Sequence, residues 1–208
     1  MKPPNVLKSF SVADLGSKDA YKLLTSAVIP RPIAWVSTVS IAGVPNLAPY
    51  SFFNAVAGDP LTVMFAASAK GDGSPKDSLK NAQETGEFVV NLADESLAEA
   101  LNHTSGSWAH GVSEFAEAGL EAAPSSLIAP PRVAAAPVAM ECRVSQLVPV
   151  KDSSSVMVLG QVALLHVHEE LLGGDGLIVA ERYRPVARLG RDEYTALGRV
   201  FRLRRPKV

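Results

Sequence analysis

The segment that most constrains the fold is residues 30–54, PRPIAWVSTVSIAGVPNLAPYSFFN. Two runs, 33–40 and 46–55, are rich in β-branched and aromatic residues, and Ala42 and Gly43 between them supply a turn, so the segment predicts a β-hairpin. Buried polar groups need hydrogen-bond partners, and a planar ligand with polar edges would supply them. We therefore interpret the hairpin as part of a binding site, because it carries many such side chains: Trp35, Ser37, Thr38, Asn46, Tyr50, Ser51 and Asn54.

The remainder of the chain alternates short apolar runs with turns. We expect helices at 17–28, from Ser74 onward and at 96–103, and strands at 61–67, 87–92, 138–148 and 156–168. Residues 104–136 are rich in Gly, Ala, Ser and Pro and predict a long loop over the surface. Strands joined by short turns favour a closed antiparallel barrel over a parallel sheet, so the expected protein is mainly β, with a few helices around a barrel.

Composition limits the classes of function. The 208 residues, 47% of them hydrophobic, suffice for one domain spanning 1–208. A net charge of -1 argues against a dedicated nucleic-acid binder or a partner of a strongly anionic membrane. Residues 181–208 are nevertheless basic, which fits a solvated end, or a surface for phosphates or another subunit. One cysteine, Cys142, suits a reducing compartment, and no stretch resembles a signal peptide or a membrane span, so we expect a cytoplasmic protein.

A second candidate for chemistry is SAKGDGSPKDS, residues 68–78. Ser68 ends a predicted strand, and a glycine-containing loop follows it. A capping-box pattern then predicts that a helix starts at Ser74, with Lys76 and Ser78 in its first turn. The free N–H groups of a first turn favour an anion. The spacing matches neither a Walker A loop nor a dinucleotide fingerprint. The segment outlines a phosphate site, although the same start is common in ordinary surface helices.

The other chemistry-bearing residues give weaker signals. His166 and His168 share one face of a predicted strand and precede two glutamates, but the sequence places no third ligand, so we predict a half-exposed strand end and no metal site. No Ser/His/Asp triad and no pair of carboxylates stands out.

Several segments together resemble a known family. They are the run at 30–54, the strand ending in Ser68, KDS at 76–78, FVVN at 88–91, EFAEAGL at 114–120, APVAMECRV at 136–144, VLGQVALLHV at 158–167 and PVARLGRDEY at 185–194. In order and spacing the chain resembles the flavin reductase-like family of FMN-binding split-barrel proteins, which includes flavoredoxins. The resemblance implies an antiparallel Greek-key split β-barrel with a few peripheral helices, usually a homodimer that holds FMN near the subunit interface.

The resemblance also implies roles for individual positions. Residues beside the isoalloxazine would be Trp35, Val36, Ser37 and Thr38, and those along the ring and ribityl chain would be Asn46, Tyr50, Ser51, Phe52, Phe53 and Asn54. The phosphate would be held by Ser68, Lys76 and Ser78. Many relatives have Thr at the position of Ser78. Asp77 would cap the helix or orient Lys76. Arg188 and Tyr194 match a late motif of the family and would touch cofactor, substrate or the partner subunit.

The function implied is an FMN-dependent oxidoreductase in which NAD(P)H reduces the flavin. Because the cofactor performs hydride transfer, the protein needs little acid–base chemistry of its own. The flavin could be a tightly held group or a released substrate. The alternative is a non-catalytic flavin-binding module, or a split barrel loaded with pyridoxal phosphate or haem; residues 33–69 contain neither the Arg nor the His that the last two would need.

Overall fold

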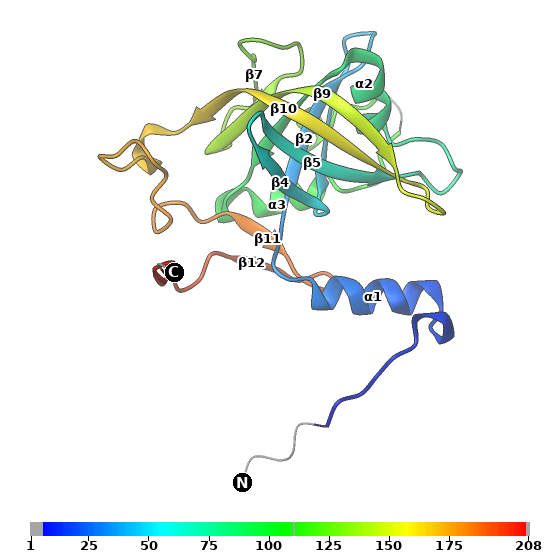
Figure 1. Cartoon of the computed structure of the whole chain (residues 1–208). Coiled ribbons are helices and arrows are strands. Elements are labelled where there is room, and N and C mark those ends of the chain that lie inside the picture. The colour runs from blue at the N-terminus through cyan, green and yellow to red at the C-terminus, as the bar shows by residue number, and fades with distance from the viewer. Residues whose placement is uncertain (1–5, 110, 207–208) are drawn as a thin grey trace.

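The fold is organised around a seven-stranded antiparallel sheet that curls into a barrel. A computed structural model describes residues 6–109 and 111–206. The strand order is β3-β2-β6-β9-β10-β5-β4 (Figure 1), and the strands are β2 (Ala34–Val39), β3 (Pro45–Tyr50), β4 (Phe53–Gly58), β5 (Leu61–Ser68), β6 (Glu87–Leu92), β9 (Val138–Pro149) and β10 (Ser155–Val167). The predicted mainly β, antiparallel barrel is therefore confirmed.

The predicted hairpin exists, but its second strand is shorter than expected. β2 and β3 pair from Ala34 opposite Tyr50 to Val39 opposite Pro45. The chain then leaves this edge at Ser51 and Phe52 and continues as β4, which pairs with β5. Among the described residues no ladder joins β3 to β4, so the barrel stays open between its two edge strands.

The connection from β5 to β6 passes through helix α2 (Asp77–Thr85), which buries Leu79 and Ala82 in the barrel core. The helix begins later than the capping-box prediction. Its first residue is Asp77 and Lys76 occupies the N-cap position, whereas the Ser74 hydroxyl donates to Asp72 Oδ1 at 2.6 Å. The predicted start at Ser74 is thus wrong, because an Asp side chain in the preceding loop takes the serine hydroxyl.

The interior of the barrel is packed with aromatic and small residues. The Phe65 ring lies 5.0 Å from Tyr50 and 5.2 Å from Phe88, centroid to centroid. Gly160 on β10 faces the Phe88 ring, and a Cβ at this position would overlap it. Cys142 is fully buried in the same core, and burial raises the pKa of its thiol to about 12, so it is protonated at neutral pH.

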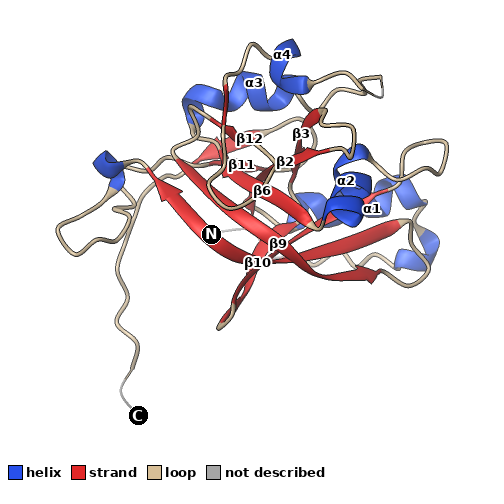
Figure 2. Cartoon of the chain, turned by 90° about the horizontal axis from the view of Figure 1, so that it is seen from above, coloured by secondary structure: helices blue, strands red, loops and turns tan. Residues whose placement is uncertain are grey.

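The outer face of β2 and β6 is covered by residues 93–136 (Figure 2). The predicted helix at 96–103 is a 3-10 turn, Glu95–Leu97, followed by α3 (Ala98–His103). The described part of residues 104–136 is mainly loop, as we expected, but it also contains three short elements, α4 (Glu114–Glu117), β7 (Ala122–Ala123) and β8 (Arg132–Val133). Phe115 and Val133 are buried against Trp35, because β2 presents an apolar side chain to each of its faces.

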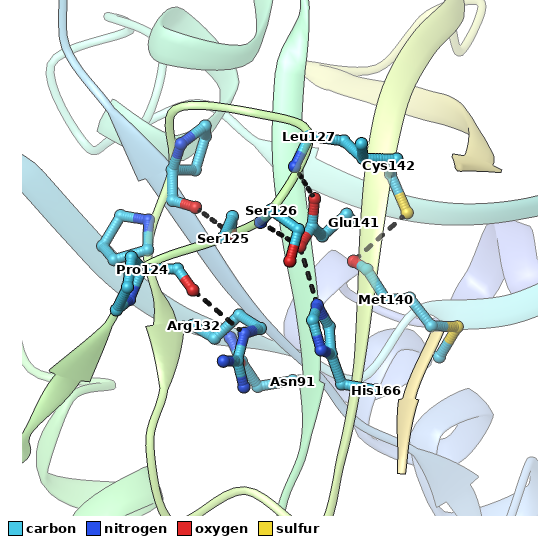
Figure 3. Close-up of polar contacts among 12 residues, drawn as sticks. Asn91, Pro124, Ser125, Ser126, Leu127, Arg132, Met140, Glu141, Cys142 and His166 are labelled. Carbon is cyan, nitrogen blue, oxygen red and sulfur yellow. Dashed lines mark hydrogen bonds and ion pairs between the residues drawn. The ribbon is translucent and has the colours of Figure 1, made fainter. Parts of the chain in front are cut away.

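A buried carboxylate holds the loop between β7 and β8 against the sheet (Figure 3). Glu141 on β9 is inaccessible to solvent and accepts hydrogen bonds from the backbone N–H groups of Ser126 (2.6 Å) and Leu127 (2.7 Å). The His166 ring on β10 lies 2.7 Å from the same carboxylate. His168 lies 3.9 Å from Glu170, and the described residues hold no group of three or more His, Cys, Asp or Glu placed to bind a metal.

A segment from the first part of the chain pairs with one from its last part below the barrel (Figure 1). Helix α1 (Ser17–Ala27) leads into β1 (Arg31–Pro32), which forms a small sheet with β11 (Val186–Arg188) and β12 (Tyr194–Ala196). The predicted helix at 17–28 is confirmed, and Gly16 is its N-cap. Apolar side chains in this helix and at its C-cap remain largely exposed: Leu24 is 56% and Val28 54% exposed. Two further 3-10 turns are Val12–Asp14 and Glu169–Leu171.

In the part of the chain that the structure describes, no helix has the length and apolar character needed to span a membrane.

Candidate functional site

A cavity of about 560 Å³ lies between β3, the start of α2 and the segment after α3. Five of the residues predicted from the sequence line it: Asn46, Tyr50, Lys76, Asp77 and Ser78. They come from two segments some thirty residues apart in the sequence, the hairpin and the start of α2. The tertiary structure therefore joins the polar hairpin to the predicted anion site in one cavity, which we call the central cavity.

Two side-chain hydrogen bonds hold the hairpin to helix α2. Asn46 donates from Nδ2 to the Ser78 hydroxyl at 2.8 Å, and Asn81 donates to the Thr38 hydroxyl at 3.0 Å. Thr38 and Asn46 are opposite each other in the β2–β3 ladder, and residues 78 and 81 lie one turn apart on one face of the helix. These bonds fix the start of α2 against the wall of the central cavity.

The central cavity also contains two hydrogen-bonding groups without a partner. The Tyr50 hydroxyl and Trp108 Nε1 are both inaccessible to solvent and form no hydrogen bond with any described residue. The pKa of Tyr50 is raised to about 12: burial is the main cause, the nearby Ser78 hydroxyl opposes it, and the negative charges of Glu114 and Asp77 add to it. Since unpaired buried donors are rare and costly, the two groups point to a ligand that carries acceptors.

Where α2 begins, two lysines and two aspartates line the same cavity: Lys70, Lys76, Asp72 and Asp77. Lys70 lies 3.0 Å from Asp77 Oδ2 in an ion pair. Lys76 is exposed, with its Nζ 5.6 Å from the centre of the Tyr50 ring, and the described residues offer it no carboxylate partner. Lys76 immediately precedes α2, where the first N–H groups of a helix favour an anion. This end of the cavity is therefore suited to a phosphate.

Glu114 lies behind the cavity wall. Its Oε2 accepts a hydrogen bond from the Leu47 N–H at 2.8 Å, and the side chain is buried. Burial is the main cause of a raised pKa for Glu114, with a smaller contribution from the charge of Asp77. The carboxylate thus anchors α4 to β3 at the cost of placing an acid in an apolar surrounding.

The other predicted residues of β2 do not line a cavity. Trp35, Val36, Ser37 and Thr38 are inaccessible to solvent. Trp35 Nε1 donates to the Thr104 hydroxyl at 2.8 Å, and the Ser37 hydroxyl donates to the Pro131 carbonyl. Residues of this chain thus satisfy the side-chain groups of β2 that we expected a ligand to satisfy.

The remaining predicted residues lie around the central cavity, each in a different place. Ser68 is exposed at the end of β5, and its hydroxyl lies 2.8 Å from that of Ser155. Arg188 and Tyr194 line a smaller cavity of about 280 Å³, which shares Pro49 and Ser105 with the central cavity. A third cavity, of about 560 Å³, is lined by the residues at the open edge of the barrel, Ser51, Phe52, Phe53 and Asn54.

Two parts of the central cavity were absent from the predicted site. Lys70 follows the strand that ends in Ser68, and residues 104–108, TSGSW, follow α3. A tryptophan among small polar residues was the available signal for the second segment, because a large aromatic side chain in an otherwise polar loop needs a surface to cover.

Comparison with known proteins agrees with this geometry. The flavin reductase like domain family matches residues 25–187. Nitrilotriacetate monooxygenase component B from Bacillus cereus is 39% identical, with a TM-score of 0.91 over 96% of this chain and 100% of that one. The 2-nitrobenzoate 2-nitroreductase NbaA from Pseudomonas fluorescens is 31% identical, with a TM-score of 0.86 over 96% of each chain.

A more distant structure, from Shewanella frigidimarina, is 19% identical, so we compare only its fold with that of this chain. It is described as having a split barrel domain, and its TM-score is 0.84 over 96% of this chain and 100% of that one. The predicted split barrel is thereby confirmed. The chain belongs to the flavin reductase like domain family.

Proposed function

We propose that this protein is an FMN-dependent oxidoreductase whose flavin is reduced by NADH or NADPH. The observation that carries the proposal is the pair of unpartnered donors, Tyr50 Oη and Trp108 Nε1, in a cavity that Lys76 and the start of α2 also line. A flavin mononucleotide has polar acceptors on a planar ring and a phosphate at the end of a flexible chain, so its chemistry matches both the donors and the start of the helix. Family membership supports a flavin-linked oxidoreductase.

The residues of this chain would bind and orient the cofactor. Lys76 and the first turn of α2 would hold the phosphate, and Tyr50, Trp108 and Asn46 would meet the polar groups of the flavin. Bound FMN would supply hydride and electron transfer, chemistry that no side chain can perform. Tyr50 stays protonated at neutral pH because burial raises its pKa to about 12, so it can donate a hydrogen bond to the cofactor throughout the physiological range.

The absorption spectrum of the purified protein tests the cofactor. We expect flavin bands, and after heat release we expect chromatography to identify FMN rather than FAD. Anaerobic titration with NADH and with NADPH then tests the donor, since either one should bleach the flavin bands. A colourless protein that takes up no added FMN would contradict the proposed cofactor, and a flavin-loaded protein that neither donor bleaches would contradict the proposed donor.

We also propose that the protein is a homodimer. The apolar side of α1 and the open edge of the barrel expose large hydrophobic residues along one cavity, among them Leu24, Val28 and Phe52, and such a surface is stable in water when another surface covers it. Sedimentation velocity should give a dimer, and Leu24→Glu should shift it toward monomer. Ile41→Glu, which changes a still more exposed apolar residue in the β2–β3 turn, should leave the dimer intact. A monomeric wild-type protein would refute this part of the proposal.

The names of the two neighbours above 30% identity suggest two kinds of electron acceptor. One is a monooxygenase component, and the other is a reductase of 2-nitrobenzoate. For this protein we propose that an acceptor reaches the flavin from the side of Ser105 and Pro49, because these two residues line both the central cavity and the smaller one. Reoxidation of the reduced protein by a nitroaromatic compound, followed under anaerobic conditions, tests direct transfer.

A further inference from the structure

The smaller cavity beside the central cavity has an unusual charge. Its volume is about 280 Å³, and it lies between α1, β1 and the turn that joins β11 to β12. Four basic side chains line it, Lys22, Arg31, Arg188 and Arg191, and its lining contains no acidic residue. The central cavity is directly adjacent, because Pro49 and Ser105 line both.

The charge at the back of this cavity has no carboxylate to balance it. Arg31 is only 6% exposed, and all the acceptors of its guanidinium are neutral: the carbonyls of Thr25, Val28 and Leu189 and the Ser51 hydroxyl. Burial lowers the pKa of Arg31, and the neighbouring charge of Arg188 lowers it further. Both effects express the free-energy cost of a buried, unbalanced positive charge, which an anion in the cavity would relieve.

The two arginines at the front are also without an acidic partner. Arg188 stacks on the Tyr194 ring, with its guanidinium carbon 4.4 Å from the ring centre, and it donates to the Arg191 carbonyl. Asp192 and Glu193 belong to the same turn but are exposed, and neither lines the cavity nor pairs with an arginine in the described structure. Among the described residues, Asp19 pairs with Lys22, whereas the three arginines of this cavity have no carboxylate partner.

The turn that carries these arginines is packed tightly against α1. A Cβ on Gly190 would lie 2.6 Å from the Ser26 hydroxyl, so only glycine allows this approach. Arg191, the next residue, has φ +54°, a left-handed conformation that is uncommon outside glycine. The packing holds the turn, with its arginines, over the mouth of the cavity.

We propose that this cavity binds the anionic group, a phosphate or a carboxylate, of the molecule that exchanges electrons with the flavin. The proposal deepens the proposed function and rests on it for the identity of that molecule. A phosphate would belong to the nicotinamide dinucleotide, whereas a carboxylate would belong to the acceptor. Arginine suits both, since its planar guanidinium forms paired hydrogen bonds with either group.

Direct binding tests the cavity without any redox reaction. The probes are inorganic pyrophosphate and benzoate, titrated calorimetrically into the flavin-loaded protein. One of them should bind, and Arg191→Gln should weaken its binding about tenfold, the loss expected for one charge-assisted hydrogen bond. Lys22→Gln should weaken it less, because Lys22 is also paired with Asp19 at 3.3 Å. Arg202→Gln is the matched control, since Arg202 is exposed and lines none of these cavities.

Single-turnover kinetics then identify the source of the anion. If the cavity holds a phosphate of the donor, Arg191→Gln should raise the half-saturating concentration of NADH or NADPH about tenfold and leave reduction by uncharged 1-benzyl-1,4-dihydronicotinamide unchanged. If it holds an acceptor carboxylate, the variant should slow reoxidation by 4-nitrobenzoate but not by its methyl ester.

The outcomes separate the two proposals. A wild-type protein that binds neither pyrophosphate nor benzoate, or an Arg191→Gln variant that binds them as tightly as the wild type, would overturn the anion site. A protein that binds one of the probes, but whose flavin neither nicotinamide reduces, would retain the anion site and contradict the proposed electron donor.

Discussion

The buried carboxylate of Glu141 lies 2.7 Å from Nε2 of His166, on the neighbouring strand of the barrel, and also accepts two backbone hydrogen bonds from the loop between β7 and β8. Burial opposes the ionisation of Glu141, but the donors around it prevail, so its pKa lies below the ordinary value of 4.5. The network connects β9, β10 and a loop that is some fifteen residues away in sequence.

Glu141→Gln should lower the free energy of unfolding at pH 7 by about 2 kcal/mol, because the amide replaces one acceptor oxygen with an NH₂ group that faces a backbone donor. A lowered pKa means that the contribution of Glu141 is present above the ordinary pKa and is lost as the pH falls below 4.5. Urea unfolding at pH 7 and at pH 4 measures both effects. Glu121→Gln, at an exposed glutamate, is the control, and equal losses for the two variants would contradict the prediction.

Glu114→Gln should instead raise the free energy of unfolding at pH 7. The amide oxygen of Gln can still accept from the Leu47 N–H, but the buried charge is removed. Because burial raises the pKa of Glu114, its favourable contribution is present below the ordinary value of 4.5 and is lost as the pH rises. At pH 7 we expect the free energy of unfolding of the variant to be about 1 kcal/mol higher than that of the wild type. A variant that is less stable than wild type at pH 7 would show that the ionised form is needed.

Gly160→Ala should destabilise the barrel by about 2 kcal/mol, because the new Cβ would overlap the Phe88 ring and lie 3.2 Å from Cys142 Cβ in a packed core. Gly174→Ala is the matched control, since nothing lies within 4 Å of the Cβ it would add. Thermal unfolding followed by circular dichroism compares the two. A wild-type melting temperature for Gly160→Ala would mean that the ring moves aside at little cost.

Tyr50→Phe should weaken FMN binding about tenfold and leave the stability of the flavin-free protein unchanged or slightly higher, because the hydroxyl has no partner within the described residues. Tyr183→Phe is a matched control: its hydroxyl is also buried and unpartnered, but it lines a different, apolar cavity. Quenching of flavin fluorescence measures both affinities. If the two variants bind FMN equally well, the Tyr50 hydroxyl is not part of the flavin site.

Lys76→Ala should weaken FMN retention more than Lys70→Ala, by about tenfold. Asp77 already neutralises Lys70 at 3.0 Å, whereas Lys76 stands at the start of α2 and the described residues offer it no acidic partner. Removal of Lys70 also leaves Asp77 with less compensation near the phosphate, so Lys70→Ala should still cause a smaller loss. The same fluorescence titration, in low and in high salt, measures the FMN affinity of each variant. Equal affinities for the two variants would place the phosphate elsewhere.

The sequence was sufficient to predict those elements whose pattern lies in neighbouring residues. β-branched runs between turns located β5, β6, β9 and β10, because the two-residue period of a strand and the residues of a turn are read from neighbouring positions. The family resemblance linked segments 30–54 and 76–78, and residues of both line the central cavity.

The sequence was insufficient wherever a partner is distant. The hydroxyls of Ser37 and Thr38 suggested a ligand, but their partners are Pro131 and Asn81, more than forty residues away. The break at Ser51 that separates β3 from β4 was likewise not visible, since the run 46–55 has strand character throughout and only pairing with different neighbours divides it.

By itself, the sequence determined the family, the strands and the presence of a polar, anion-suited region, because these depend on residue type and spacing. Only the tertiary structure decided which polar groups remain without partners. Tyr50 and Trp108 are left unpaired in one cavity, while Ser37 and Thr38 are satisfied by other parts of the chain. Hydrogen-bond satisfaction depends on what packs against each group, and that is fixed by contacts between segments far apart in the chain.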